Sequence, residues 1–202
     1  MKVKYYQDEM VGEGIVADLF SKVIDKTQRF PGERHTVLMT DTGPRIASYT
    51  GPNTRLDIRL RSQNPKISNP LGPTDRASMR HDLDYALATN TQDIREADQR
   101  MINKLKDIES KNIDFKVNTK IVSGLMKSKT LIEDTIGKRG ELFSGIKKGQ
   151  QKQNTLSLAD QSLYEKKRTE LEMLGYGYNG RRLPFLLGDY RNLDDIRIKT
   201  RN

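Results

Sequence analysis

The sequence predicts a mainly α protein in which a compact helical module lies between extended N- and C-terminal arms. Two observations predict the helices: long stretches lack glycine and proline, and apolar residues recur every three or four positions within them. A third predicts the arms, because only 34% of the 202 residues are hydrophobic whereas 31% are charged. So few apolar residues cannot form a core along the whole chain.

The chain is expected to divide into three parts. Residues 1–36 form an N-terminal amphipathic helix and arm, residues 37–136 form the module, and residues 137–202 form a basic linker, a helix and an extended docking arm. The N-terminal helix is predicted over residues 13–28, where the apolar residues at helical spacing are Ile15, Val16, Leu19, Phe20, Val23 and Ile24. We favour core packing for this apolar face, and binding at a membrane interface is the alternative.

The module begins with an extended region. Residues 35–58 are predicted to form a strand or extended segment that leads into a loop, with breaks at Gly43-Pro44 and Gly51-Pro52. Residues 59–73 contain three prolines and no hydrophobic period, so we expect an irregular loop there.

Two paired helices are predicted next. The first begins at Thr74 or Asp75, either of which is a good N-cap. After a break at Asn90-Thr91, the second covers residues 91–111. Its apolar face consists of Ile94, Ala97, Met101, Leu105 and Ile108. Because the connecting turn is short, the two helices should be antiparallel.

Two more helices are predicted later in the chain. One covers about residues 117–136. The other begins at Ser157, with Asp160 in a position that resembles a capping box, and ends at Gly175. Residues 137–154, between them, are rich in Gly, Lys and Gln and are expected to be a linker.

The chain is basic, with 36 Lys and Arg against 27 Asp and Glu and a net charge of +9. This charge suits nucleic acid, an acidic protein surface or an anionic membrane, and it equally suits a surface that is merely soluble. Nucleic acid is possible through the basic flanks, although no motif supports it. The tail, residues 176–202, combines aromatic residues and arginines without a period, and we expect it to dock on a partner.

The sharpest chemical signal is His81-Asp82-Leu83-Asp84-Tyr85 on the first paired helix. His81 and Tyr85 are one turn apart and share a face, whereas Asp82 is rotated by ~100° toward a neighbouring flank. Asp98 lies across the turn on the facing helix. A carboxylate there can hold one imidazole nitrogen, while the other takes a proton from water as a general base. Tyr85 could orient Asp98 by a hydrogen bond.

A loop upstream, residues 49–54, has the composition of an oxygen-ligand site. Its glycine lets backbone carbonyls point inward, and together with one or two carboxylate oxygens they form the kind of site that calcium prefers. The same loop can direct a backbone N–H at a developing oxyanion. His35 belongs to no such set, and we expect it to be structural.

Three motifs, in order along the chain, carry a resemblance to a known family. They are YTGP at 49–52, HDLDY at 81–85 and ADQRMI at 97–102. Together they resemble the phospholipase A2 domain in the minor capsid protein of parvoviruses and, more distantly, are similar to secreted phospholipases A2. The match covers about residues 45–108, and the ordered set is far more specific than HDLDY alone.

The resemblance implies a phospholipase A2-like fold, namely an antiparallel helix pair with a calcium loop. His81 would be the general base, Asp98 its partner and Tyr85 the support of Asp98. Asp82 would supply the carboxylate ligand of Ca²⁺. The implied reaction is hydrolysis of the sn-2 ester of a glycerophospholipid by an activated water.

The remaining calcium ligands are implied in the loop. Tyr49 and Gly51 would give backbone carbonyls, and the Gly51 N–H would face the oxyanion. Asn53 stands where the family often has a second glycine, and asparagine also tolerates left-handed backbone angles.

The resemblance further implies an enzyme carried in a virion, with a phospholipid membrane as substrate and capsid or other virion proteins as partners. It would act at the host endosomal membrane and breach that membrane during viral entry. The absence of cysteine fits this viral branch rather than the disulfide-rich secreted one. The alternative is a catalytically silent structural or cement protein of a capsid that keeps the same helices for packing.

Overall fold

The computed structural model describes residues 30–141 and 156–177, together with residues 144, 146, 149 and 151. The helix expected at 13–28 and the tail beyond Gly177 lie outside these residues. Within them the chain is mainly helical, which confirms the predicted fold class at that level.

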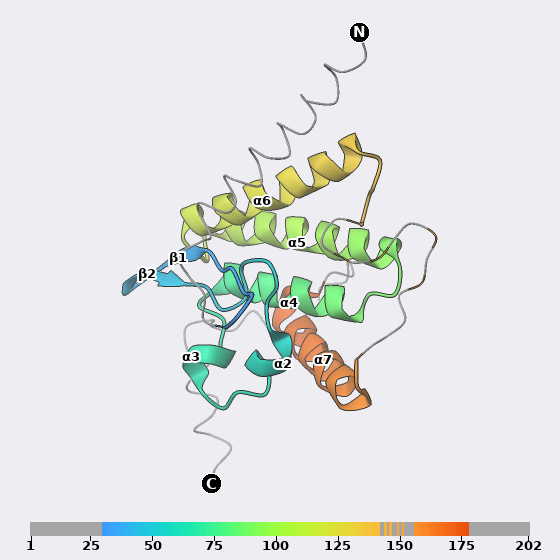
Figure 1. Cartoon of the computed structure of the whole chain (residues 1–202). Helices are drawn as coiled ribbons and strands as arrows, with labels where there is room; N and C mark the ends of the chain where they lie inside the picture. Colours follow the sequence, from blue (N-terminus) through green and yellow to red (C-terminus); the bar gives the residue numbers. More distant parts are fainter. Residues whose placement is uncertain are drawn as a thin grey trace.

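The described chain starts with a small antiparallel hairpin, β1 (Val37–Thr40) and β2 (Gly43–Ile46), within the segment expected to be extended (Figure 1). Thr40 pairs with Gly43, and Gly43 has a φ of +103°, which favours glycine in this tight turn. Leu38 is buried, whereas its neighbours on β1 are exposed, as alternation along a strand requires.

Two single-turn helices follow. The first is α2 (Leu56–Arg59), and the second is α3 (Pro65–Ser68), which interrupts the irregular loop predicted for residues 59–73. Asn64 caps α3 by accepting a hydrogen bond from the Lys66 backbone N–H, and a proline at the first helical position has its φ already set.

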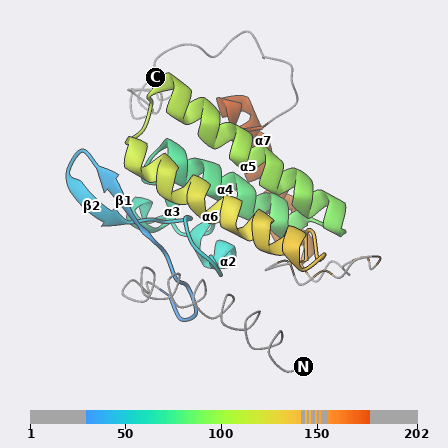
Figure 2. The same cartoon turned by 90° about the horizontal axis from the view of Figure 1, so that it is seen from above.

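The centre of the molecule is the pair α4 (Pro73–Leu87) and α5 (Thr91–Lys111), which lie side by side in both views (Figures 1 and 2). They are antiparallel, as predicted. Helix α4 begins slightly earlier than expected, with Gly72 as its N-cap. Helix α5 begins at the predicted break, where Asn90 forms a capping box with Asp93.

Helix α6 (Lys116–Thr135) packs along α5 and also reaches α4 and β1. Asn118 ties it to the hairpin, because its side chain accepts from the Met39 N–H and donates to the Met39 carbonyl, at 2.8 and 2.9 Å. The two long helices α5 and α6 lie together on one side of α4 (Figure 2).

Helix α7 (Leu158–Leu171) packs against α4 and continues into one π-helical turn, η1 (Glu172–Tyr176). Ser157 caps α7 as predicted, and Gly175 ends the helical run with a φ of +79°. The sequence assigned this helix to the segment outside the module, and the tail was expected to begin at Tyr176. The structure instead places Tyr176 in the core, with 4% of its surface exposed.

The core lies where α4, α5, α6 and α7 meet. Its large buried members on these helices are Met79, Leu83, Met101, Leu105, Ile108, Val122, Met126, Tyr164 and Leu171. No helix within residues 30–141 and 156–177 is both long and apolar enough to cross a bilayer.

Candidate active site

The structure brings His81 of α4 and Asp98 of α5 into direct contact. The imidazole Nε2 lies 2.8 Å from Asp98 Oδ1, and the two side chains are 14% and 8% exposed. The antiparallel packing of the helices places the two residues opposite each other. An imidazole held in this way keeps its Nδ1 free of Asp98.

Tyr85, one turn after His81, completes this contact. Its hydroxyl donates a 2.6 Å hydrogen bond to the same Asp98 Oδ1, and its ring centroid lies 4.2 Å from that of His81. Burial, reinforced by the Asp98 charge, raises the pKa of Tyr85, so the phenol remains a donor.

The other Asp98 oxygen binds a residue that sequence reasoning missed. Lys129 of α6 donates to Asp98 Oδ2 at 2.5 Å and to Glu133 Oε1 at 2.8 Å, and all three side chains are buried. A signal for this was present in the sequence. Lys129 and Glu133 fall on the same helical face as the apolar Val122 and Met126, where a solvated ion pair does not belong.

Asp82 faces away from Asp98, toward the loop. Its Oδ1 lies 3.9 Å from His81 Nδ1, beyond hydrogen-bonding reach. Burial raises the pKa of Asp82, and the groups that oppose this shift by stabilising its charged form include Thr54 at the end of the loop. Among the described residues, none is a hydrogen-bond partner of its buried Oδ2. A buried carboxylate oxygen without a donor is a position where a cation would be stabilising.

The loop from Tyr49 to Thr54 depends on two unusual backbone angles. Gly51 has a φ of +156°, and a Cβ there would lie 2.0 Å from the Arg34 carbonyl oxygen, so a side chain has no room. Asn53 has a φ of +61°, in the left-handed region that the sequence analysis considered for it. Thr54 Oγ1 donates to the Gly51 carbonyl at 3.2 Å.

Asp75, which was predicted only as a helix cap, fastens this loop to α4. Its carboxylate accepts from the backbone N–H groups of Ser48 and Tyr49 and from the Thr50 hydroxyl, at 2.8 to 2.9 Å. It also accepts from the Leu71 N–H at 2.9 Å. Tyr49 itself is fully buried, and its hydroxyl donates to the Ser68 carbonyl.

His35 also lies beside the loop, although the sequence linked it to nothing. Its Nδ1 bonds the Ala47 carbonyl at 2.9 Å, and its Nε2 lies 3.3 Å from Thr54 Oγ1. Burial lowers the pKa of His35, so the ring is neutral near pH 7. Nothing in its sequence neighbourhood indicates this position, because its partners are distant in the chain.

The residues near Asp82 fit a calcium ion only if the backbone contributes. Within residues 30–141 and 156–177, no group of three or more His, Cys, Asp or Glu side chains could hold a metal. A cation at Asp82 would therefore take the orphaned Oδ2 together with carbonyl oxygens of the loop, which is an oxygen-only donor set. Tyr49, Gly51 and Asn53 remain the predicted contributors.

The electrostatics of His81 depend on both carboxylates. Burial alone would lower its pKa, but Asp82 and Asp98 raise the pKa of His81 to about 9. A protonated imidazole cannot accept a proton from water. A positive charge beside Asp82 would offset one carboxylate and lower this pKa.

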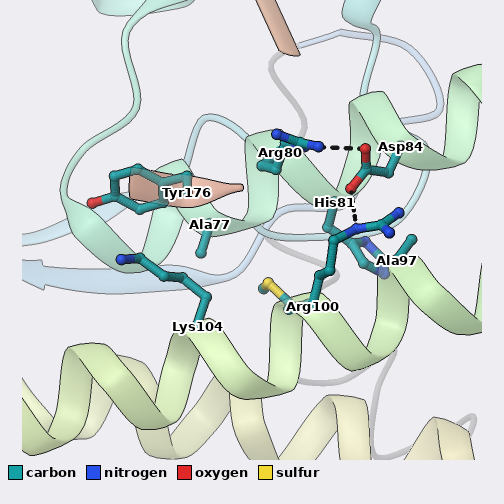
Figure 3. Close-up of a pocket in the computed structure, with 9 residues that line it drawn as sticks. Ala77, Arg80, His81, Asp84, Ala97, Arg100, Lys104 and Tyr176 are labelled. Carbon is teal, nitrogen blue, oxygen red and sulfur yellow. Dashed lines mark hydrogen bonds and ion pairs between the residues drawn. The ribbon is translucent and has the colours of Figure 1, made fainter. Parts of the chain in front are cut away.

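A second polar cluster lies beside the His81–Asp98 dyad, where α4 contacts α5 and η1 (Figure 3). Arg80 and Arg100 both bind the buried carboxylate of Asp84, at 3.0 and 3.1 Å, and Arg80 also binds Glu172 at 2.9 Å. These side chains form ion pairs with one another, and the pairs connect α4 to α5 and η1. Asp84 of the HDLDY motif is thus a structural residue.

Comparison of the chain with models of protein families, with curated proteins and with solved structures finds no match.

Proposed function

We propose that this protein is a calcium-dependent phospholipase A2 with a phospholipase A2-like helix pair. The observation that carries the proposal is the position of His81 between two acids: Asp98 holds its Nε2 at 2.8 Å, and Asp82 lies on its Nδ1 side at 3.9 Å. A helix pair that needed only packing would have no use for a buried imidazole flanked in this way.

His81 acts as the general base in this proposal. Its Nδ1 accepts a proton from a water molecule, whose oxygen attacks the carbonyl carbon of the sn-2 ester. Asp98 holds the Nε2–H, fixes the tautomer and stabilises the imidazolium that forms. The proton then passes to the departing alcohol, so that a fatty acid and a lysophospholipid leave.

Asp82 and the carbonyls of Tyr49, Gly51 and Asn53 would hold Ca²⁺. When bound, the ion supplies Lewis-acid polarisation of the ester carbonyl. The partnerless Asp82 Oδ2 and the left-handed Asn53 support this part of the proposal. The family resemblance extends it to a virion, where capsid proteins would be partners and a host membrane the substrate.

The test is release of fatty acid from mixed phospholipid vesicles with Ca²⁺, Mg²⁺ or excess chelator. We expect hydrolysis with Ca²⁺ alone, because an oxygen-only site of this size disfavours the smaller, stiffer Mg²⁺. His81→Asn should lower the rate by at least ~10²-fold. Asp82→Asn should weaken calcium binding, so that hydrolysis is lost or needs a much higher Ca²⁺ concentration.

Asp41→Asn is the matched control, since Asp41 is exposed on the hairpin turn. Activity that persists in excess chelator, or in a folded His81→Asn variant, would reject the enzyme. A folded wild type without hydrolysis on any vesicle would favour the catalytically silent capsid protein instead.

A further inference from the structure

Lys129 is a buried lysine whose charge is directed at the dyad. Its side chain is 8% exposed, and its ammonium lies 5.6 Å from the centroid of the Tyr85 ring. Burying an ammonium is costly unless anions surround it, and here two carboxylates do so, from Asp98 and Glu133.

The three contacts to Asp98 restrict its carboxylate to one orientation. His81 and Tyr85 share Oδ1, whereas Lys129 is the donor to Oδ2 within the described part of the chain. A carboxylate held from one oxygen only can rotate about its terminal bond, because that torsion is broad. The contact at Oδ2 removes this freedom and keeps Oδ1 aligned with the imidazole.

Glu133 in turn holds Lys129 in place. Its Oε1 binds the ammonium at 2.8 Å, and its Oε2 accepts from the Gly140 N–H at 3.0 Å. Gly140 is itself confined, because a Cβ there would lie 2.5 Å from the Thr91 carbonyl oxygen at the start of α5. Glu133 therefore links Lys129 to the Gly140 backbone, which lies against the start of α5.

We propose that Lys129, held by Glu133, is a positioning residue that fixes the orientation of Asp98 toward His81. This inference rests on the proposed function, because it gives Lys129 its role in the hydrolysis performed by that dyad. It adds a third helix to the active site, since the dyad itself comes from α4 and α5 only.

The test uses Lys129→Met combined with Glu133→Gln, which removes both charges of the pair while the glutamine can still accept from Gly140. The matched control is Lys127→Met with Asp134→Asn, which removes one lysine and one acid from exposed positions of the same helix. We expect kcat to fall about 10- to 100-fold, the size of loss seen when the outer-shell partner of a metal-ligating histidine is removed, with KM and calcium dependence unchanged.

A spectroscopic measurement makes the result independent of turnover. The downfield imidazole N–H resonance of His81, which reports its bond to Asp98, should shift or broaden in the double variant and stay in place in the control. Wild-type kcat together with an unchanged resonance would overturn the proposal. A loss of kcat that matches only the fraction of unfolded protein would overturn it as well.

If the double variant does not fold, the single variant Glu133→Gln tests the positioning role. It removes one ion-pair partner of Lys129 and leaves the side chains of His81 and Asp98 unchanged. A kcat lowered by about tenfold supports the positioning role, and an unchanged kcat rejects it. If the wild type hydrolyses no ester, the proposed function fails by itself. The resonance in the same variants then still shows whether Lys129 orients the pair.

Discussion

At the scale of single residues, Gly51 is a position where the loop lies tightly against another part of the backbone. Its φ of +156° and the 2.0 Å that a Cβ would leave to the Arg34 oxygen both exclude a side chain. The obstacle is backbone, which cannot turn aside as a flexible side chain can. The shape of the predicted calcium loop therefore depends on the absence of a Cβ atom at Gly51.

Gly51→Ala should lower the free energy of unfolding by about 2 kcal/mol or more, through strain and clash, and should weaken activation by Ca²⁺. Urea denaturation and calcium titration of hydrolysis measure the two effects. Gly124→Ala is the matched control, because Gly124 lies in α6 with open space around it. That change should stabilise the protein by up to about 1 kcal/mol, so destabilisation by both variants would contradict the argument.

The buried ion pair of Glu33 and Arg59 also supports the structure of the loop. Arg59 donates to both oxygens of Glu33 at 2.6 and 2.8 Å, and both side chains are fully buried. The guanidinium also lies 5.9 Å from the centroid of the Tyr49 ring, so the pair supports the start of the loop.

Arg59→Met should cost about 3–5 kcal/mol, because it leaves the Glu33 carboxylate buried without its partner. Thermal and urea unfolding check this value. Arg55→Met is the control, since the Arg55–Asp57 pair is about half exposed and an ion pair in water contributes little to stability. Equal losses in the two variants would show that burial does not decide the value.

At the scale of elements, the start of α5 is the clearest case of local sequence determining structure. Asp93 accepts hydrogen bonds from the Thr89 N–H and hydroxyl and from the Asn90 N–H. Partial burial alone would raise its pKa, but these bonds keep the pKa of Asp93 below its usual value.

Asp93→Asn should therefore cost about 1 kcal/mol at neutral pH and should flatten the dependence of stability on pH in acid. The carboxylate's contribution is fully present above the unfolded pKa of about 3.9. It is lost as the pH falls through the lower pKa of the folded state. Urea midpoints between pH 2 and 6 test this, with Asp41→Asn as control, and an unchanged acid slope in the Asp93 variant would refute it.

The helices could be predicted because their signals are local. Asn90 and Ser157 both cap a helix where the sequence places them, and Gly175 ends the last one. The single turns α2 and α3 were missed, since four residues give no period to detect. The burial of Tyr176 was missed for another reason: the surface that receives it is formed by residues far away in the sequence.

At the scale of the whole molecule, η1 attaches the C-terminal helix to the module through that tyrosine. The Tyr176 ring has Lys104 of α5 4.6 Å and Arg76 of α4 5.6 Å from its centroid. A buried aromatic ring with cations from two helices connects three elements at one point.

Tyr176→Ala should lower the free energy of unfolding by about 3 kcal/mol, as for other large-to-small changes of buried aromatic residues. Met173→Ala, three residues earlier and 52% exposed, should change it by less than about 0.5 kcal/mol. Calorimetry of both variants gives the comparison. A tolerated Tyr176→Ala would mean that α7 does not depend on this contact.

The candidate site was predicted only in part from the sequence. His81, Asp82, Tyr85 and Asp98 lie near one another because helical spacing and a short turn bring them together. Lys129 reaches the same region from α6, and His35 reaches it from the segment before β1. Asp75 lies on α4 itself and contacts the loop. Their approach depends on how the helices and the loop pack, which no local period encodes.

Asp75 has a consequence for the time course of opening and closing. One carboxylate in the first turn of α4 accepts the Ser48, Tyr49 and Leu71 amides. These protons can exchange with solvent only when that turn releases them, so all three should exchange at a common rate set by the helix end. We expect the loop to acquire its shape together with the first turn of α4. The loop is ordered because it is bonded to the helix. A hydrogen–deuterium exchange experiment should therefore show that the loop and the first turn of α4 open together.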